Sequence, residues 1–178
     1  MTIATFEGKS PRIGSESYVH PSADVFGDVT IGERCWIGPG ARIRGDYGTI
    51  VIGDCCSVED NCVIHVRPGE QTTIGNWVTI GHAAVIHNVK RIHDYVIVGM
   101  GAVVSDWAVV GEWAAVGEGA VVRQAQEIPA EHIAVGVPAR VLDKLVGEDY
   151  KAQWTRFKQT YVDLALRYPG AYVPERDG

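Results

Sequence analysis

The chain has 178 residues, which suits a single domain, and it carries a formal net charge of −6. This acidic balance argues against nucleic acid or an anionic membrane surface as a partner. No apolar run approaches the ~20 residues of a membrane span, and no basic stretch followed by an apolar one opens the sequence. We therefore expect a cytoplasmic protein with no membrane or nucleic-acid partner.

A repeat of period six begins near the N-terminus and organises most of the chain. Isoleucine or valine occupies its slots first at Ile13, Val19, Val25, Ile31, Ile37 and Ile43. The repeat resumes after a three-residue insertion at Ile52, Val58 and Ile64, and after a four-residue insertion it runs from Ile74 to Ile128. Period six is typical of a triangular solenoid, in which each hexapeptide supplies one short strand and one corner. We predict an all-β fold with a parallel β-helix over residues 1–141, its β-branched side chains stacked inside.

Two histidines fall on one column of this solenoid. Slots three hexapeptides apart share a face on successive coils, so Arg44, His65 and His87, which each follow a slot, stack in a column. His82 belongs to the neighbouring face and points away from the pair within one chain. A second chain around a threefold axis brings it to the pair, and three imidazoles at a common point form a zinc-type ligand set. A polar strip at a subunit interface explains the same spacing equally well.

The apolar spacing changes beyond Ala134, where the period of six fades. Intervals of three and four residues predict an amphipathic helix over residues 142–170, packed on a flank of the solenoid. Pro169-Gly170 predicts its end, and residues 171–178 are expected to form a tail that is frayed at residues 174–178.

Four segments around the histidines are shared with a known family. They are Arg44-Gly45-Asp46, Asp60-Asn61-Cys62-Val63-Ile64-His65, Ile80-Gly81-His82-Ala83-Ala84-Val85-Ile86-His87 and Val98-Gly99-Met100-Gly101-Ala102-Val103-Val104. Together they resemble the γ-class carbonic anhydrases and the similar bacterial carnitine and phenylacetate operon proteins, over roughly residues 19–161. The resemblance implies a left-handed β-helix and a homotrimer. It implies Zn²⁺, or else Fe²⁺ or Co²⁺, bound by His65 and His87 of one subunit and His82 of the next.

The resemblance also implies an activity, the reversible hydration of CO₂ to bicarbonate by a metal-bound hydroxide at the trimer interface. Arg44 and Asp46 match family positions in an ion pair that orders the site, and Tyr161 matches a helix tyrosine near it. Glu59 stands where the family usually has glutamine, and we expect its carboxylate to orient or deprotonate the metal-bound water. Glu59, Tyr161, Arg44 and Asp46 are thus the candidate catalytic residues.

Other functions fit the same repeat. A hexapeptide acyltransferase shares the fold, binds CoA between subunits and uses one histidine as general base without a metal. A thioesterase acting on CoA esters and a weakly active structural subunit are further alternatives. Turnover of acetyl-CoA without metal favours the transferase, whereas stoichiometric bound metal favours the hydratase.

Overall fold

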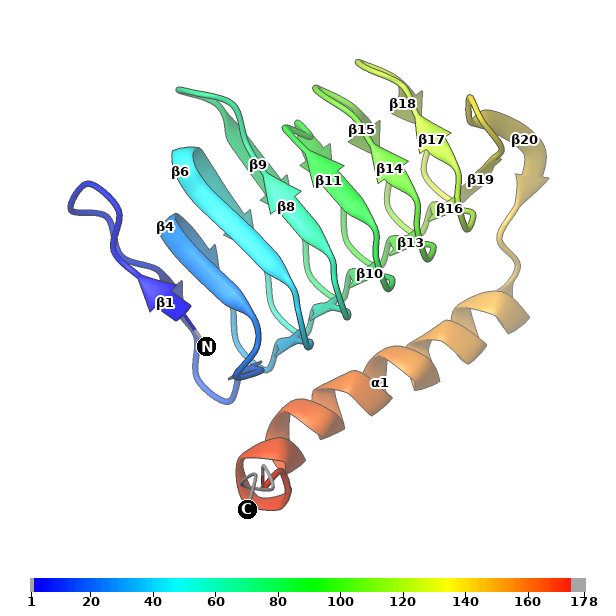
Figure 1. The fold of residues 1–178 in the computed structure, drawn as a ribbon. Helices are drawn as coiled ribbons and strands as arrows, with labels where there is room; N and C mark the ends of the chain where they lie inside the picture. Colours follow the sequence, from blue (N-terminus) through cyan, green and yellow to red (C-terminus); the bar gives the residue numbers. More distant parts are fainter. Residues whose placement is uncertain (1, 174–178) are drawn as a thin grey trace.

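The computed structural model describes residues 2–173, which form a parallel β-solenoid followed by one helix, α1 (Glu148–Ala171). Figure 1 shows the coils stacked along one axis, with α1 lying along one flank. The larger of two hydrogen-bonded sheets contains β1 (Thr2–Ala4), β2 (Arg12–Ile13), β4 (Asp24–Ile31), β6 (Arg42–Ile52), β8 (Val63–His65), β9 (Gln71–Ile74), β11 (Val85–His87), β12 (Arg91–Ile92), β14 (Val103–Val104), β15 (Val109–Val110), β17 (Val121–Val122) and β18 (Glu127–Ile128). The smaller one, called here the helix-side sheet, contains β3 (Tyr18–Val19), β5 (Trp36–Ile37), β7 (Ser57–Val58), β10 (Thr79–Ile80), β13 (Ile97–Val98), β16 (Ala115–Val116), β19 (His132–Val135) and β20 (Arg140–Leu145).

The β-branched residues of the period-six slots form the core. Ile43, Ile64 and Ile86 pair with one another on successive coils and are fully buried. On the helix-side sheet Val58, Ile80 and Val98 do the same. Because slot pairs with slot, the predicted parallel β-helix is confirmed, and the residues beside each slot lie at known heights along the axis.

Strand β6 accommodates the three-residue insertion by running across two faces. Its first part pairs with β8, where Arg44 lies opposite His65, and its second part pairs with β9. The register between β4 and β6 shifts between Gly27 and Val29, which absorbs the extra residues. Asp46, on the same strand, is thereby held next to His65.

One corner of the solenoid carries a ladder of large aromatic residues. Trp77, Tyr95 and Trp113 all have positive φ, between 54° and 58°. Their rings stack almost parallel, with centroids 6.3 Å apart in the first pair and 4.8 Å in the second. Residues other than glycine rarely adopt this left-handed backbone conformation, which costs conformational free energy. Stacking of the three rings offsets that cost at each position.

The C-terminal region differs from the predicted helix at its start. Residues 140–145 form β20, which pairs antiparallel with β19, and the helix begins only at Glu148. The spacing of Leu142, Leu145 and Val146 also fits a helix. The segment forms a strand instead, because its backbone pairs with an edge of the sheet that would otherwise be open. The helix continues past Pro169 because the Tyr172 N–H donates to the Tyr168 carbonyl. The expected fraying at residues 174–178 lies outside the described residues.

Helix α1 packs against β3, β5 and β7 of the helix-side sheet. An aromatic seam fixes this end of the helix, with Tyr168 lying 4.4 Å from Trp36 and 5.1 Å from Tyr18 between ring centroids. Across residues 2–173, no helix combines the length and apolar character that crossing a bilayer requires.

Candidate functional site

A histidine and a buried glutamate meet at the corner that follows the helix-side sheet. Glu59 follows β7 and His82 follows β10, and these strands pair so that the two side chains lie one coil apart. His82 Nε2 lies 3.1 Å from Glu59 Oε2, with 44% of the histidine side chain exposed but only 7% of the glutamate. The Asp60 backbone N–H donates to His82 Nδ1 at 3.3 Å. The ring proton therefore lies on Nε2, facing Glu59, and the lone pair lies on Nδ1.

Helix α1 adds Tyr161 to this pair. Burial raises the pKa of Glu59, and the charge of His82 and a hydrogen bond from Tyr161 oppose that rise. Burial and the nearby Glu59 carboxylate raise the pKa of Tyr161, so its hydroxyl keeps its proton and acts as a donor. Tyr161, Glu59 and His82 thus form a short polar chain, called here the helix-side site.

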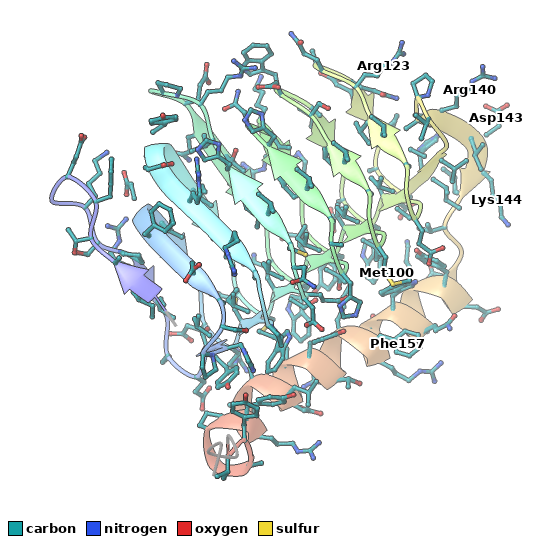
Figure 2. All side chains as sticks on the ribbon, viewed as in Figure 1. Met100, Arg123, Arg140, Asp143, Lys144 and Phe157 are labelled. Atoms are coloured by element: carbon teal, nitrogen blue, oxygen red, sulfur yellow. The ribbon has the colours of Figure 1, made fainter. Side chains whose placement is uncertain are left out.

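The helix-side site opens on an apolar cavity of about 680 Å³ between α1 and strands β10, β13 and β16. Figure 2 labels Met100, on the solenoid, and Phe157, on α1, which both line the cavity and are each 50% exposed. Its polar lining comprises Glu59, His82, Thr79 and Tyr161 together with Glu118, Tyr150 and Thr160, and most of the other lining side chains are apolar, among them Ile97, Val98, Val116, Ile133, Trp154 and Leu164. A reactive polar group at the wall of an apolar cavity is the usual design of a small-molecule site.

A buried lysine lies next to the same site. Lys158 Nζ donates to Thr79 Oγ1 and to the Val96 carbonyl, both at 3.1 Å. Burial lowers the pKa of Lys158 to about 7, because the charged amine is almost fully removed from water. Lys158 was not predicted from the sequence, although a lysine inside the apolar stripe between Trp154 and Tyr161 was a visible signal.

The second polar group is the histidine column, formed by His65 and His87 with their ion-paired neighbours. The two rings lie 5.6 Å apart between centroids, on paired strands β8 and β11. His65 Nε2 lies 3.0 Å from Asp46 Oδ1 and 3.1 Å from Arg44 Nη2. The structure therefore brings Arg44, Asp46, His65 and His87 together, and burial lowers the pKa of His65.

His87 has two partners that were not predicted from the sequence. Its Nδ1 lies 3.3 Å from Asp106 Oδ2, and Asp106 also forms an ion pair with Arg67. The hydrogen bond from Arg67 is the main cause that lowers the pKa of Asp106 to about 2. Extending the column by one further coil would have brought the segment around Asp106 beside His87.

Comparison with known proteins finds curated relatives that resemble one segment of the chain. No family model matches it. A 65-residue segment, 36% of the chain, is 45% identical to carnitine operon protein CaiE from Proteus sp. (strain LE138). The segment covers 33% of that protein, so the chain spans about a third of the length of the curated relatives it matches.

Solved structures match over nearly the whole chain. A hexapeptide transferase family protein from Anaplasma phagocytophilum is 29% identical with a TM-score of 0.88, covering 94% of this chain and 98% of that one. A Bacillus cereus protein described as an acetyltransferase is 30% identical with a TM-score of 0.79, covering 94% and 96%. PerB from Caulobacter crescentus, in complex with CoA and GDP-perosamine, is 26% identical with a TM-score of 0.62, covering 74% and 57%. These matches confirm the left-handed β-helix of hexapeptide repeats.

The same findings correct the prediction of carbonic anhydrase chemistry. The matching structures are described as transferases, so hydration of CO₂, a lyase reaction, is the wrong activity. Zn²⁺, Fe²⁺ or Co²⁺ at His65, His82 and His87 is also wrong, because among residues 2–173 no three histidine, cysteine or acidic side chains gather to hold a metal. The repeat predicted that His65 and His87 share a column, as the paired strands show, but within the chain Asp46, Asp106 and Glu59 already contact the three histidines.

Proposed function

Since this chain belongs to the hexapeptide transferase family, we propose that it transfers an acyl group from a CoA thioester to a small acceptor at the helix-side site. The observation that carries the proposal is the contact of His82 with the buried Glu59 at the wall of the apolar cavity. The complex of PerB with CoA, on the same fold, supports CoA as the carrier of the acyl group.

The geometry assigns one role to each polar residue. His82 Nδ1 accepts a 3.3 Å hydrogen bond from the Asp60 N–H and lies 3.7 Å from Asp60 Oδ2, and it exchanges that hydrogen bond for the proton of the amine or hydroxyl of the acceptor. The acceptor forms a bond to the thioester carbon, the carbon–sulfur bond breaks, and the departing thiolate receives that proton from the imidazolium. Glu59 stabilises the charged ring through Nε2–H, and Tyr161 holds the glutamate in place.

Water is a second acceptor that the structure favours, because almost half of the His82 side chain is exposed to solvent. With water in place of the acceptor, the same steps release a free acid and CoA. The chain then acts as a thioesterase, and the two reactions differ only in what enters beside His82.

We also expect a homotrimer, with the histidine column contributing to contacts between subunits rather than to the chemistry. Arg44 and Asp46 form an ion pair of 3.5 Å beside His65, and 41% of the Arg44 side chain is exposed. An exposed arginine next to a largely covered aspartate can reach a neighbouring chain. Sedimentation of the purified protein measures its assembly, and a monomer with full activity would contradict this assignment.

The proposal is tested by the release of free CoA thiol from acyl-CoA substrates, with and without small amine and hydroxyl acceptors, in metal-free buffer. We expect His82→Gln to lose about 10²-fold or more in kcat/KM. His93→Gln, a histidine outside both polar groups, serves as the matched control and should retain the wild-type rate. Acceptor-independent release identifies hydrolysis, and equal activity of the two variants would exclude His82 as the base.

A further inference from the structure

The outward positions of the helix-side sheet change from polar to apolar along the solenoid axis. The parallel register aligns Ser57, Thr79, Ile97, Ala115 and Ile133 on five successive coils. The first two lie level with the helix-side site, where Lys158 holds Thr79. The last three all line the apolar part of the cavity. A ligand that lies along this row meets the reactive residues at one end and mostly apolar side chains at the other, where Glu118 and Tyr150 are the polar residues of the lining.

The small side chain of Ala115 deepens the cavity at the middle of this row. Ala115 lies between Ile97 and Ile133, and its own side chain is buried. Trp154 and Leu164 of α1 also line the cavity. Coils repeat every ~4.8 Å, so the row from Thr79 to Ile133 covers roughly 14 Å. A cavity of about 680 Å³ exceeds what an acetyl group requires and lies within the range of drug-sized ligand sites.

We propose that this cavity binds the apolar chain of a medium-length acyl group, and that Ala115 sets the longest chain that the protein accepts. The inference rests on the acyl transfer proposed above and names its substrate class. The thioester carbon then lies beside His82, and the chain extends past Ile97 towards Ile133. A protein segment inserted here instead would bury His82 and Glu59, whereas a substrate brings its reacting atom to them.

The test is a series of acetyl-, butyryl-, hexanoyl-, octanoyl- and decanoyl-CoA assayed with the full chain. In the wild type we expect kcat/KM to rise about fourfold for each methylene that the cavity covers. Ala115→Phe should lower the ratio of decanoyl to acetyl turnover at least tenfold, and Ile133→Ala should shift the preference to longer chains. Ala152→Phe, at an exposed position of α1 outside the cavity, should leave the profile unchanged.

Binding without chemistry separates this inference from the proposed function. Decanoate is titrated against the wild type while tryptophan fluorescence is followed, with Trp154→Phe identifying the reporting residue. Saturable quenching that Ala115→Phe abolishes supports the acyl cavity even if no thioester is turned over. A flat chain-length profile with active enzyme would overturn it and leave the proposed function intact. A change of oligomeric state in Ala115→Phe would also overturn it, because the groove would then be covered by a second copy of the chain.

Discussion

The two polar groups of this solenoid are built by the same register and differ in what surrounds them. In the histidine column, His65 and His87 lie against ion pairs that involve the exposed arginines Arg44 and Arg67. In the helix-side site, His82 lies against a glutamate that is almost fully covered, at the wall of an apolar cavity. Removal of the carboxylate from water strengthens its interaction with a charged ring, whereas solvent screens the exposed pairs.

Stacked histidines alone are therefore not sufficient to form a reactive site. A repeat of six residues places side chains in columns wherever histidine occurs, and its geometry is similar on every face. Helix α1 covers only one face, and there it supplies both Tyr161 and one wall of the cavity. The site therefore depends on an element outside the repeat.

Replacement of a core residue beside each group tests whether the same hydrophobic core supports both groups. Ile64 lies beside His65 and Ile80 lies near His82, and both are fully buried. Replacement of either by alanine should cost ~2–5 kcal/mol in the free energy of unfolding, because each leaves a cavity in the same core. Urea denaturation followed by circular dichroism measures the loss, with the half-exposed Leu145→Ala as control. A loss at only one of the two isoleucines would show that the groups are supported differently.

Isosteric amides then distinguish the chemistry of the two groups. Glu59→Gln should lower kcat/KM for thioester turnover about 10²-fold, because it removes the charge that stabilises the His82 imidazolium. Asp106→Asn makes the same change beside His87 and should alter the rate less than about threefold, as expected of a substitution outside the site. Thiol-release assays on both variants measure the contrast, and equal losses would remove the distinction between the groups.

Lys158 gives the helix-side site a pH dependence of stability in the neutral to alkaline range. Its pKa is lowered to about 7 from an ordinary 10.5, so between these values the unfolded chain binds more protons and stability rises with pH. Lys158→Met should be more stable than the wild type at pH 6 by about 1–2 kcal/mol, after allowance for two lost hydrogen bonds. The advantage should shrink as the pH approaches 10. Denaturant unfolding of both proteins across this range measures it, and parallel curves would contradict it.

The smallest effect concerns stability in the histidine column. Asp106→Asn removes the ion pair with Arg67, in which the arginine side chain is 52% exposed to solvent and the aspartate side chain 14%. Solvent-exposed pairs of this kind contribute little, so the denaturation midpoint should move only slightly. The remaining shift should vanish in about 1 M salt, where charges are screened within a few ångströms. A large shift that persists in salt would assign the column a structural role.

The features that could be predicted from the sequence are those that follow from the six-residue period. The slots from Ile13 to Ile128 predicted the parallel strands, and the count of hexapeptides placed Arg44, His65 and His87 in one column. Strand β20 was missed because Leu142 and Leu145 have a spacing that also fits a helix, and only the open edge of β19 decides between them.

The environment of each histidine could not be predicted in the same way. Glu59 was selected as a candidate because of its position beside a metal, yet the structure shows it bound to His82 within one chain. The cavity lies between the solenoid and a face of α1 that includes Trp154 and Phe157, and its width depends on side-chain size and packing. Neither the contact between Glu59 and His82 nor the cavity beside α1 produces a periodic pattern in the sequence.

The stacked rings of Trp77, Tyr95 and Trp113 provide a spectroscopic probe of their own corner of the solenoid. Rings stacked in parallel at 4.8 and 6.3 Å couple their electronic transitions and should give a distinct near-ultraviolet circular dichroism band. Far-ultraviolet signal at the helical bands reports α1 instead. A single thermal scan can therefore reveal whether the corner melts together with the helix or survives its detachment.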